Sequence, residues 1–166
     1  MRNFEACVRH ILAAEGGLVH DPHDPGGLTH FGISQRAYPS LDIKALTVAD
    51  AMRIYQRDYW ALIQGEDLPT GVDLVMLDHA VNAGPATAIR LMQYLVRVVV
   101  DGVLGPRTLA GITSADPEDL ITAFTERRLA YYHSLPNWRL YQVGWSRRAQ
   151  RAKRAALAMA REAKAP

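Results

Sequence analysis

The chain has 166 residues, of which 49% are hydrophobic and 22% are charged, a composition typical of one globular domain. No apolar run approaches the roughly 20 residues that cross a bilayer, and the N-terminus lacks the apolar segment of a signal peptide, so we expect synthesis in the cytoplasm. The formal net charge of +2 conceals an asymmetry, because residues 139–166 carry +7 and residues 1–138 carry −5.

The first predicted element is an amphipathic helix over residues 4–15. Its apolar stripe has helical spacing and consists of Phe4, Val8, Ile11 and Leu12. Asn3 is the expected N-cap, and the glycines at 16 and 17 are the expected stop. Glu15 ends this helix on the apolar face. Cys7 lies on that face too, where we expect it to pack; as the single cysteine it excludes an intramolecular disulfide.

Residues 18–34 lose the helical period. Three glycines and two prolines interrupt this segment, which favours a turn-rich loop or a small irregular β-hairpin. A loop or hairpin of this kind can place polar side chains at the edge of a substrate-binding cleft.

Helical patterns follow in the middle of the chain. Thr47, with Asp50 three residues later, predicts a capping box that opens a helix through about Leu62. Residues 72–84 and 85–96 predict two helices, which the Gly-Pro pair between them separates. Residues 96–100 have β-propensity, but turn residues follow them closely, so we predict a loop.

Three more helices complete the predicted elements. Residues 106–112 form a short helix with proline in its first turn. Asp116 as N-cap and Pro117 in the first turn begin a long helix to about Leu135. Residues 139–163, rich in Ala and Arg, form the last. The elements together predict a mostly α fold.

Two carboxyl groups near the end of the first helix have the environments that glycoside hydrolysis requires. The reaction needs a carboxylic acid that is still protonated near neutral pH and usually a second, ionised carboxylate. Glu15 lies on an apolar face at the negative end of a helix dipole, which raises a carboxyl pKa. Asp24 lies in a polar loop and should stay ionised. The alternative is an exposed helix end and an ordinary turn residue.

The motif that begins at Glu15 resembles a known family. Glu-Gly-Gly at a helix end, followed by Asp-Pro-Gly-Gly, Thr29 and Phe-Gly-Ile, is similar to the motif of glycoside hydrolase family 108, N-acetylmuramidases of phage endolysins and some bacterial proteins. Residues 78–84 resemble the second motif of that family, and residues 101–109 resemble a peptidoglycan-binding region. The resemblance implies a lysozyme-like helical domain with a small irregular hairpin after the first helix.

The resemblance also implies one domain in three regions. Residues 1–66 would carry the catalytic motif, residues 67–138 the helical peptidoglycan-binding-like region, and residues 139–166 the basic C-terminal helix. The implied partner is the peptidoglycan glycan strand, and no cofactor is implied. We expect a monomer that acts on the cell wall.

Catalytic residues can be carried over by position. The catalytic glutamate of the family falls on Glu15, and the glutamate, aspartate and threonine of related phage muramidases correspond to Glu15, Asp24 and Thr29. The match departs at one point, because His30 occupies the threonine position and the hydroxyl arrives one residue earlier. We therefore include His30 among the candidate substrate contacts. Asp78, His79 and Asn82 are either contacts to sugar hydroxyls and acetamides or residues that cap helices and satisfy buried backbone.

The implied reaction is hydrolysis of the β-1,4 bond between N-acetylmuramic acid and N-acetylglucosamine, as in a phage endolysin. Two alternatives stay open. A lytic transglycosylase uses one glutamate and no water, and it leaves a 1,6-anhydro sugar. A wall-binding module would have lost its catalytic site.

Three further features admit more than one interpretation. His20, Asp21, His23 and Asp24 are metal-ligand types, but they lack a regular scaffold, so we predict no metal site. The basic helix over 146–163 is either a solvated surface helix or a segment attracted to anionic envelope polymers. The negative body of the chain excludes a nucleic-acid partner. Five aromatic residues near the last helix are expected mostly in the core; they are Tyr131, Tyr132, Trp138, Tyr141 and Trp145.

Overall fold

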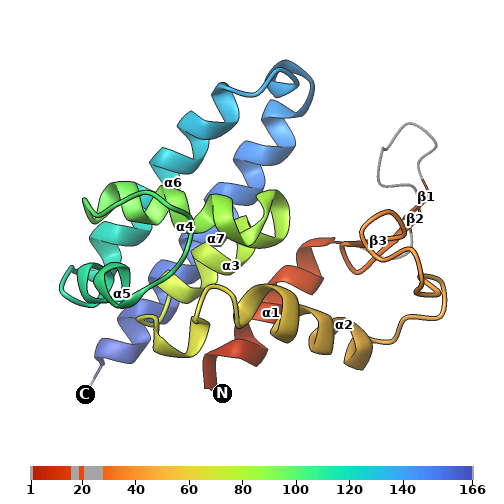
Figure 1. Ribbon diagram of the computed structural model, residues 1–166, viewed down its shortest axis with the longest axis horizontal. Helices are drawn as coiled ribbons and strands as arrows, with labels where there is room; N and C mark the ends of the chain where they lie inside the picture. Colours follow the sequence, from red (N-terminus) through yellow and green to blue (C-terminus); the bar gives the residue numbers. More distant parts are fainter. Residues whose placement is uncertain (1, 16–18, 21–27, 166) are drawn as a thin grey trace. The chain divides into compact units, whose positions relative to one another are not determined.

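The computed structural model describes residues 2–15, 19–20 and 28–165. It divides into two compact units, residues 1–58 and residues 59–166. Helices dominate the described residues (Figure 1), which confirms the mostly α prediction. None of the helices in these ranges is both long enough and apolar enough to cross a membrane. The prediction of a single domain with a regional boundary at residue 66 stays a prediction.

The described residues of the first unit form two α-helices and a small sheet. Helix α1 spans Arg2–Glu15, and strands β1 (Val19–His20), β2 (Leu28–His30) and β3 (Ile33–Ser34) form an antiparallel sheet in chain order. The predicted hairpin after the first helix is therefore confirmed. Asn3 lies inside α1 and not at its N-cap, because the helix begins two residues before the apolar stripe. Cys7 is buried, as expected of a packing residue.

Helix α2 (Val48–Tyr55) begins at the predicted capping box. The Thr47 side chain accepts from the Asp50 backbone N–H, and the Asp50 carboxylate accepts from the Thr47 backbone N–H at 3.0 Å. The α geometry ends earlier than predicted and continues as a π-helical turn over Gln56–Trp60. A π turn adds a residue to the turn and so rotates the side chains that follow it. Trp60 at its end is buried, and its indole N–H donates to Glu66 at 3.2 Å.

The second unit holds the remaining helices. After a short 3₁₀ turn at Gly65–Asp67, they are α3 (Val72–Ala83), α4 (Pro85–Leu95), α5 (Pro106–Thr113), α6 (Pro117–His133) and α7 (Trp138–Lys164). The predicted break between α3 and α4 is present at Gly84. Asp116 caps α6 as predicted, since its carboxylate accepts from the backbone N–H groups of Glu118 and Asp119. Residues 96–105, between α4 and α5, form the predicted loop.

Helix α3 is the central helix of the second unit. Every residue from Val72 to Ala80 is buried, and α3 packs against α4, α6 and α7. Gly71 precedes α3 with a φ of 90°, and a Cβ atom there would lie 2.4 Å from the Ala156 carbonyl oxygen of α7. Only glycine therefore permits this approach of the two helices.

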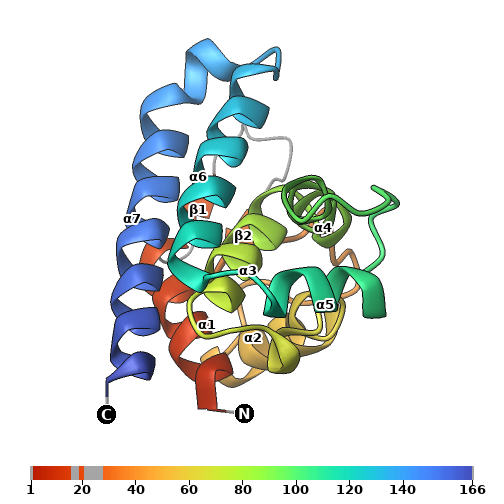
Figure 2. The same ribbon diagram turned by 90° about the vertical axis from the view of Figure 1, so that its left-hand side faces the viewer.

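Helix α7 packs through a stripe of small residues. Its buried residues are Ala149, Ala152, Ala156 and Ala160, and it lies side by side with α6 (Figure 2). Some of its basic residues pair with acids of the same unit. Arg161 contacts Glu118 at 2.9 Å, and Lys164 contacts Asp116 at 2.9 Å. The observed packing thus gives α7 a structural role.

Candidate active site

Glu15 is the last residue of helix α1, as the sequence predicts. The C-terminal end of a helix disfavours a nearby anion and so favours the protonated form of a carboxyl group. The side chain of Glu15 and the whole of Asp24 lie outside the described residues. The same is true of the predicted metal-ligand types from 21 to 24, while His20 is described only as part of β1. Among the described residues, no cluster of three or more His, Cys, Asp or Glu side chains is arranged to hold a metal ion.

Thr29 and His30 are neighbours on strand β2. Thr29 is paired with Val19 of β1 and with Ser34 of β3, and both candidate side chains are half-buried. Successive side chains of a strand point to opposite faces of the sheet, so these two cannot both face the same substrate.

His30 is engaged with its own unit. Its Nδ1 lies 3.2 Å from the Ile43 carbonyl oxygen, and its ring stacks on Phe31 at a centroid distance of 3.8 Å. The Phe31 carbonyl accepts a hydrogen bond from the Tyr55 hydroxyl at 2.7 Å. These contacts fix the turn after β2. The Thr29 side chain lies on the opposite face of the strand. Its part in catalysis stays a prediction.

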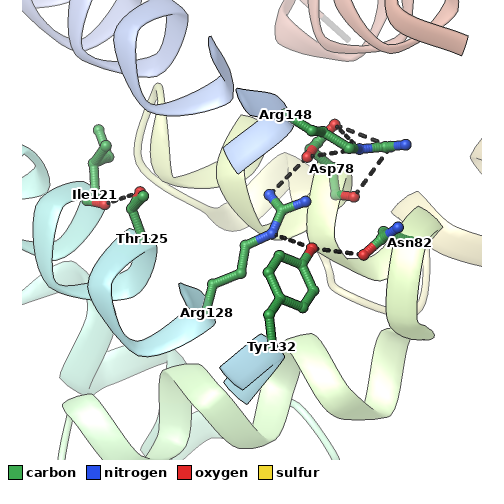
Figure 3. Close-up of polar contacts among 7 residues, drawn as sticks. All are labelled: Asp78, Asn82, Ile121, Thr125, Arg128, Tyr132 and Arg148. Atoms are coloured by element: carbon green, nitrogen blue, oxygen red, sulfur yellow. Dashed lines mark hydrogen bonds and ion pairs between the residues drawn. The ribbon is translucent and has the colours of Figure 1, made fainter. Parts of the chain in front are cut away.

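The second motif contributes a buried carboxylate held by two arginines (Figure 3). Arg128 of α6 contacts Asp78 Oδ2 at 2.6 Å, and Arg148 of α7 contacts Asp78 Oδ1 at 3.1 Å. Burial alone would raise the pKa of Asp78, but the charges of the two guanidinium groups outweigh it and hold the pKa below its ordinary value. Asp78 is therefore ionised and joins α3, α6 and α7.

Asn82 extends this network by one hydrogen bond. The Tyr132 hydroxyl donates to Asn82 Oδ1 at 2.6 Å and accepts from Arg128 Nε at 2.7 Å. The observed partners of Asp78 and Asn82 are thus side chains of the same unit, which favours the structural alternative for this motif. Its contact with sugars stays a prediction.

His79 is buried beside this network. Neither ring nitrogen has a hydrogen-bond partner among the described residues. The ring lies edge-on to Phe124, Tyr131 and Tyr132 at centroid distances of 5.9, 5.6 and 5.7 Å. Burial, with a contribution from the Arg128 charge, lowers the pKa of His79 to about 3. The imidazole is therefore neutral in the folded protein.

Stability should depend on pH through His79. Its pKa is lower when folded than when unfolded, so its contribution to stability is complete above about pH 6.5 and is lost as pH falls from there to about 3. From pH 7 to pH 5 we expect His79 to cost the wild type about 2 kcal/mol of unfolding free energy. In urea titrations, His79→Leu should not show this loss of unfolding free energy between pH 7 and pH 5. The exposed His133, changed to Gln, serves as control, and a wild-type pH dependence in His79→Leu would contradict the assignment.

Sequence reasoning missed the partners of Asp78. Arg128 lies at a helical spacing that places it on the buried face of α6 with Ile121, Phe124 and Tyr132. A charged residue within an apolar stripe requires a buried counter-charge. That pattern is visible in the sequence and could have indicated that Arg128 has a buried counter-charge, although not which residue supplies it.

The prediction that the five aromatic residues lie mostly in the core is wrong. Tyr132 alone is buried, Tyr131, Trp138 and Trp145 are half-buried, and Tyr141 is 43% exposed. The rings cover one another near the turn between α6 and α7. Trp145 lies 5.0 Å from Tyr132 and 5.2 Å from Tyr141, measured between ring centroids. These aromatic side chains are therefore covered mainly by one another and not by a hydrophobic core.

Comparison with known proteins places these features in a family. Residues 8–84 match the model of the family described as Glycosyl hydrolase 108, and residues 87–150 match that of the family described as Predicted Peptidoglycan domain. Among solved structures, the chain is similar to that of Brucella abortus SagA. The two are 36% identical over 96% of this chain and 97% of that chain, with a TM-score of 0.91. The sequence matches none of the curated proteins.

Proposed function

The chain belongs to the glycosyl hydrolase 108 family and carries a peptidoglycan domain, and from this premise we propose that it is an N-acetylmuramidase. The proposed reaction is hydrolysis of the β-1,4 bond between N-acetylmuramic acid and N-acetylglucosamine. The observation that carries the proposal is the position of Glu15 at the end of α1, within the matched residues 8–84. The proposed place of action is the cell wall.

Glu15 is the proposed general acid. It would donate its proton to the glycosidic oxygen as the bond to the anomeric carbon of N-acetylmuramic acid breaks, so that the leaving sugar departs as a neutral alcohol. The negative end of the helix dipole favours the protonated carboxyl group that this step consumes. Positive charge that develops on the sugar ring then needs a carboxylate nearby.

Asp24 is the proposed second carboxylate, and Thr29 is its proposed helper. As a base, Asp24 would take a proton from a water molecule that attacks the anomeric carbon from the face opposite Glu15, with inversion of configuration. Inversion requires carboxyl groups roughly 6.5–9.5 Å apart, whereas a separation of about 5 Å is typical of retention through a covalent intermediate.

The chemistry of the new chain ends tests the bond that is cut. We expect digests of purified peptidoglycan, reduced with borohydride, to contain reduced N-acetylmuramic acid at the new ends by mass spectrometry. A glucosaminidase would leave reduced N-acetylglucosamine instead. A lytic transglycosylase would leave a 1,6-anhydro sugar, lighter than the hydrolysis product by one water. Either of the last two products would contradict the proposal.

The basic helix α7 carries a second part of the proposal. Its residues that lie outside the ion pairs with Asp78, Asp116 and Glu118 include Arg139, Arg147, Lys153 and Arg154. These charges would attract the protein, as a monomer, to anionic polymers of the envelope. The buried residues of α7 are alanines instead.

A further inference from the structure

An open pocket lies in the second unit, between the end of α4 and the first turn of α5. Its volume is about 760 Å³. The loop that joins the two helices (Figures 1 and 2) contributes most of its lining residues. The described residues that line it include Arg97, Val99, Asp101, Val103, Arg107 and Thr108. The pocket lies within residues 87–150, which match the peptidoglycan domain.

A buried glutamine holds the loop in place. Gln93 Nε2 donates to Asp101 Oδ1 at 2.7 Å and to the Val103 carbonyl oxygen at 3.0 Å, and Gln93 Oε1 accepts from the Gly102 backbone N–H at 2.9 Å. The same Asp101 oxygen accepts from the Val103 backbone N–H at 2.8 Å. Oδ1 of Asp101 is thus occupied within the loop, and these hydrogen bonds order the loop around the pocket.

The charged residues that line the pocket are two arginines, Arg97 and Arg107, and one carboxylate, Asp101, so the lining is net positive and favours an anion. Arg97 and Arg107 are exposed, and neither forms an ion pair with another residue in the part of the chain that the structure describes. Gly105, the N-cap of α5, has no side chain to cap the first turn. The positive end of the α5 dipole therefore adds to the two guanidinium charges. Guanidinium groups bind carboxylates through paired hydrogen bonds.

Arg97 occupies a backbone position that favours glycine. It follows α4 with a φ of 57°, and the Val98 N–H bonds back to the Gln93 carbonyl oxygen at 3.1 Å. This is the arrangement of a helix C-terminal cap, in which glycine is common because a Cβ atom strains the left-handed conformation. Local backbone preference therefore does not explain an arginine here, whereas a ligand for its side chain would.

The remaining lining distinguishes between the two components of peptidoglycan. Sugar rings stack on aromatic side chains, and none of the described residues that line the pocket is aromatic. Val99 and Val103, 73% and 67% exposed, offer aliphatic contact instead. Stem peptides combine free carboxylates with alanine methyl groups. Building on the proposed function, we propose that this pocket binds the stem peptide of peptidoglycan, with Arg97 and Arg107 holding a carboxylate.

Calorimetry with a synthetic stem tetrapeptide tests this assignment on the full chain. We expect wild type to bind the tetrapeptide, and Arg97→Gly and Arg107→Gln each to bind it about tenfold more weakly. The peptide with every carboxylate amidated should bind about tenfold more weakly to wild type. Arg147, an exposed arginine of α7 outside the pocket, is the matched control, and Arg147→Gln should bind like wild type. Arg97→Gly should also melt no lower than wild type, because glycine suits that backbone.

Some outcomes would overturn the assignment. These are equal binding by wild type and both pocket variants, equal binding of the free and amidated peptides, or absence of binding to wild type. Displacement of the peptide by a neutral N-acetylglucosamine tetrasaccharide would assign the pocket to the glycan instead. Because calorimetry does not depend on turnover, loss of the proposed hydrolase activity would leave a positive binding result intact. A failure of peptide binding would equally leave the hydrolase proposal standing.

Discussion

Glu15→Gln is expected to lower the rate of peptidoglycan hydrolysis by about 10²–10⁴-fold, the usual contribution of a general acid. Glutamine keeps the size of the side chain but carries no acidic proton for the glycosidic oxygen. The measurement is the initial rate of turbidity loss of purified peptidoglycan, in parallel with a melting curve. The melting temperature should change little, since the substitution removes at most one charge at a helix end.

Glu5 provides a matched control on the same helix. It is exposed and forms an ion pair with Arg9 at 3.3 Å, one helical turn away. Glu5→Gln should clear peptidoglycan at the wild-type rate, so that a general effect of charge on α1 is separated from loss of the acid. Equal clearing by wild type and Glu15→Gln would refute the assignment of Glu15.

Asp78→Asn is expected to lower the free energy of unfolding by about 3–5 kcal/mol, the cost of breaking a buried ion pair on one side. The substitution keeps the shape of the side chain but leaves Arg128, 1% exposed, without its counter-charge. Arg148 then stands beside a second unneutralised guanidinium group, which adds repulsion. Urea unfolding at neutral pH measures the change.

An exposed ion pair of the same unit calibrates this result. Arg161→Gln breaks the contact with Glu118, in which the arginine side chain is 66% exposed, and should cost at most about 1 kcal/mol. Asp78 also has an acid dependence of definite sign. Its folded pKa is lowered, so its stabilisation is present above the unfolded pKa of about 3.9 and is lost as pH falls through the folded pKa. An unchanged urea midpoint in Asp78→Asn would show that the network is dispensable.

Local rules predicted the helices well because their signals lie within a few residues. The caps at Thr47 and Asp116 are formed as expected, since side chain and backbone partners are at most three residues apart. The π-helical turn over Gln56–Trp60 was not foreseen. A helical period does not indicate where one turn will take up an additional residue.

The second motif shows where local reasoning stops. The partners of Asn82 and Asp78 lie 50 and 70 residues away, on α6 and α7. No local spacing specifies such pairs, because the helix packing that creates them is set by the whole core. The prediction for the five aromatic residues was wrong for a related reason. Their spacing along the chain does not show that they lie near the turn between α6 and α7, where Tyr132 alone of the five is buried. Glu15 was placed by period and resemblance together, and its position at the end of α1 agrees with both.

The ion pairs of Asp78 also bear on the order of events during synthesis. Arg148 is made 70 residues after Asp78, so the ribosome must have translated α7 as far as Arg148 before the buried carboxylate can acquire both cations. Residues 1–58, one compact unit of the folded chain, are translated well before that point, and N-terminal units generally fold first as they emerge. During that interval α3 has been translated, but α7, against which it packs in the folded unit, has not been completed.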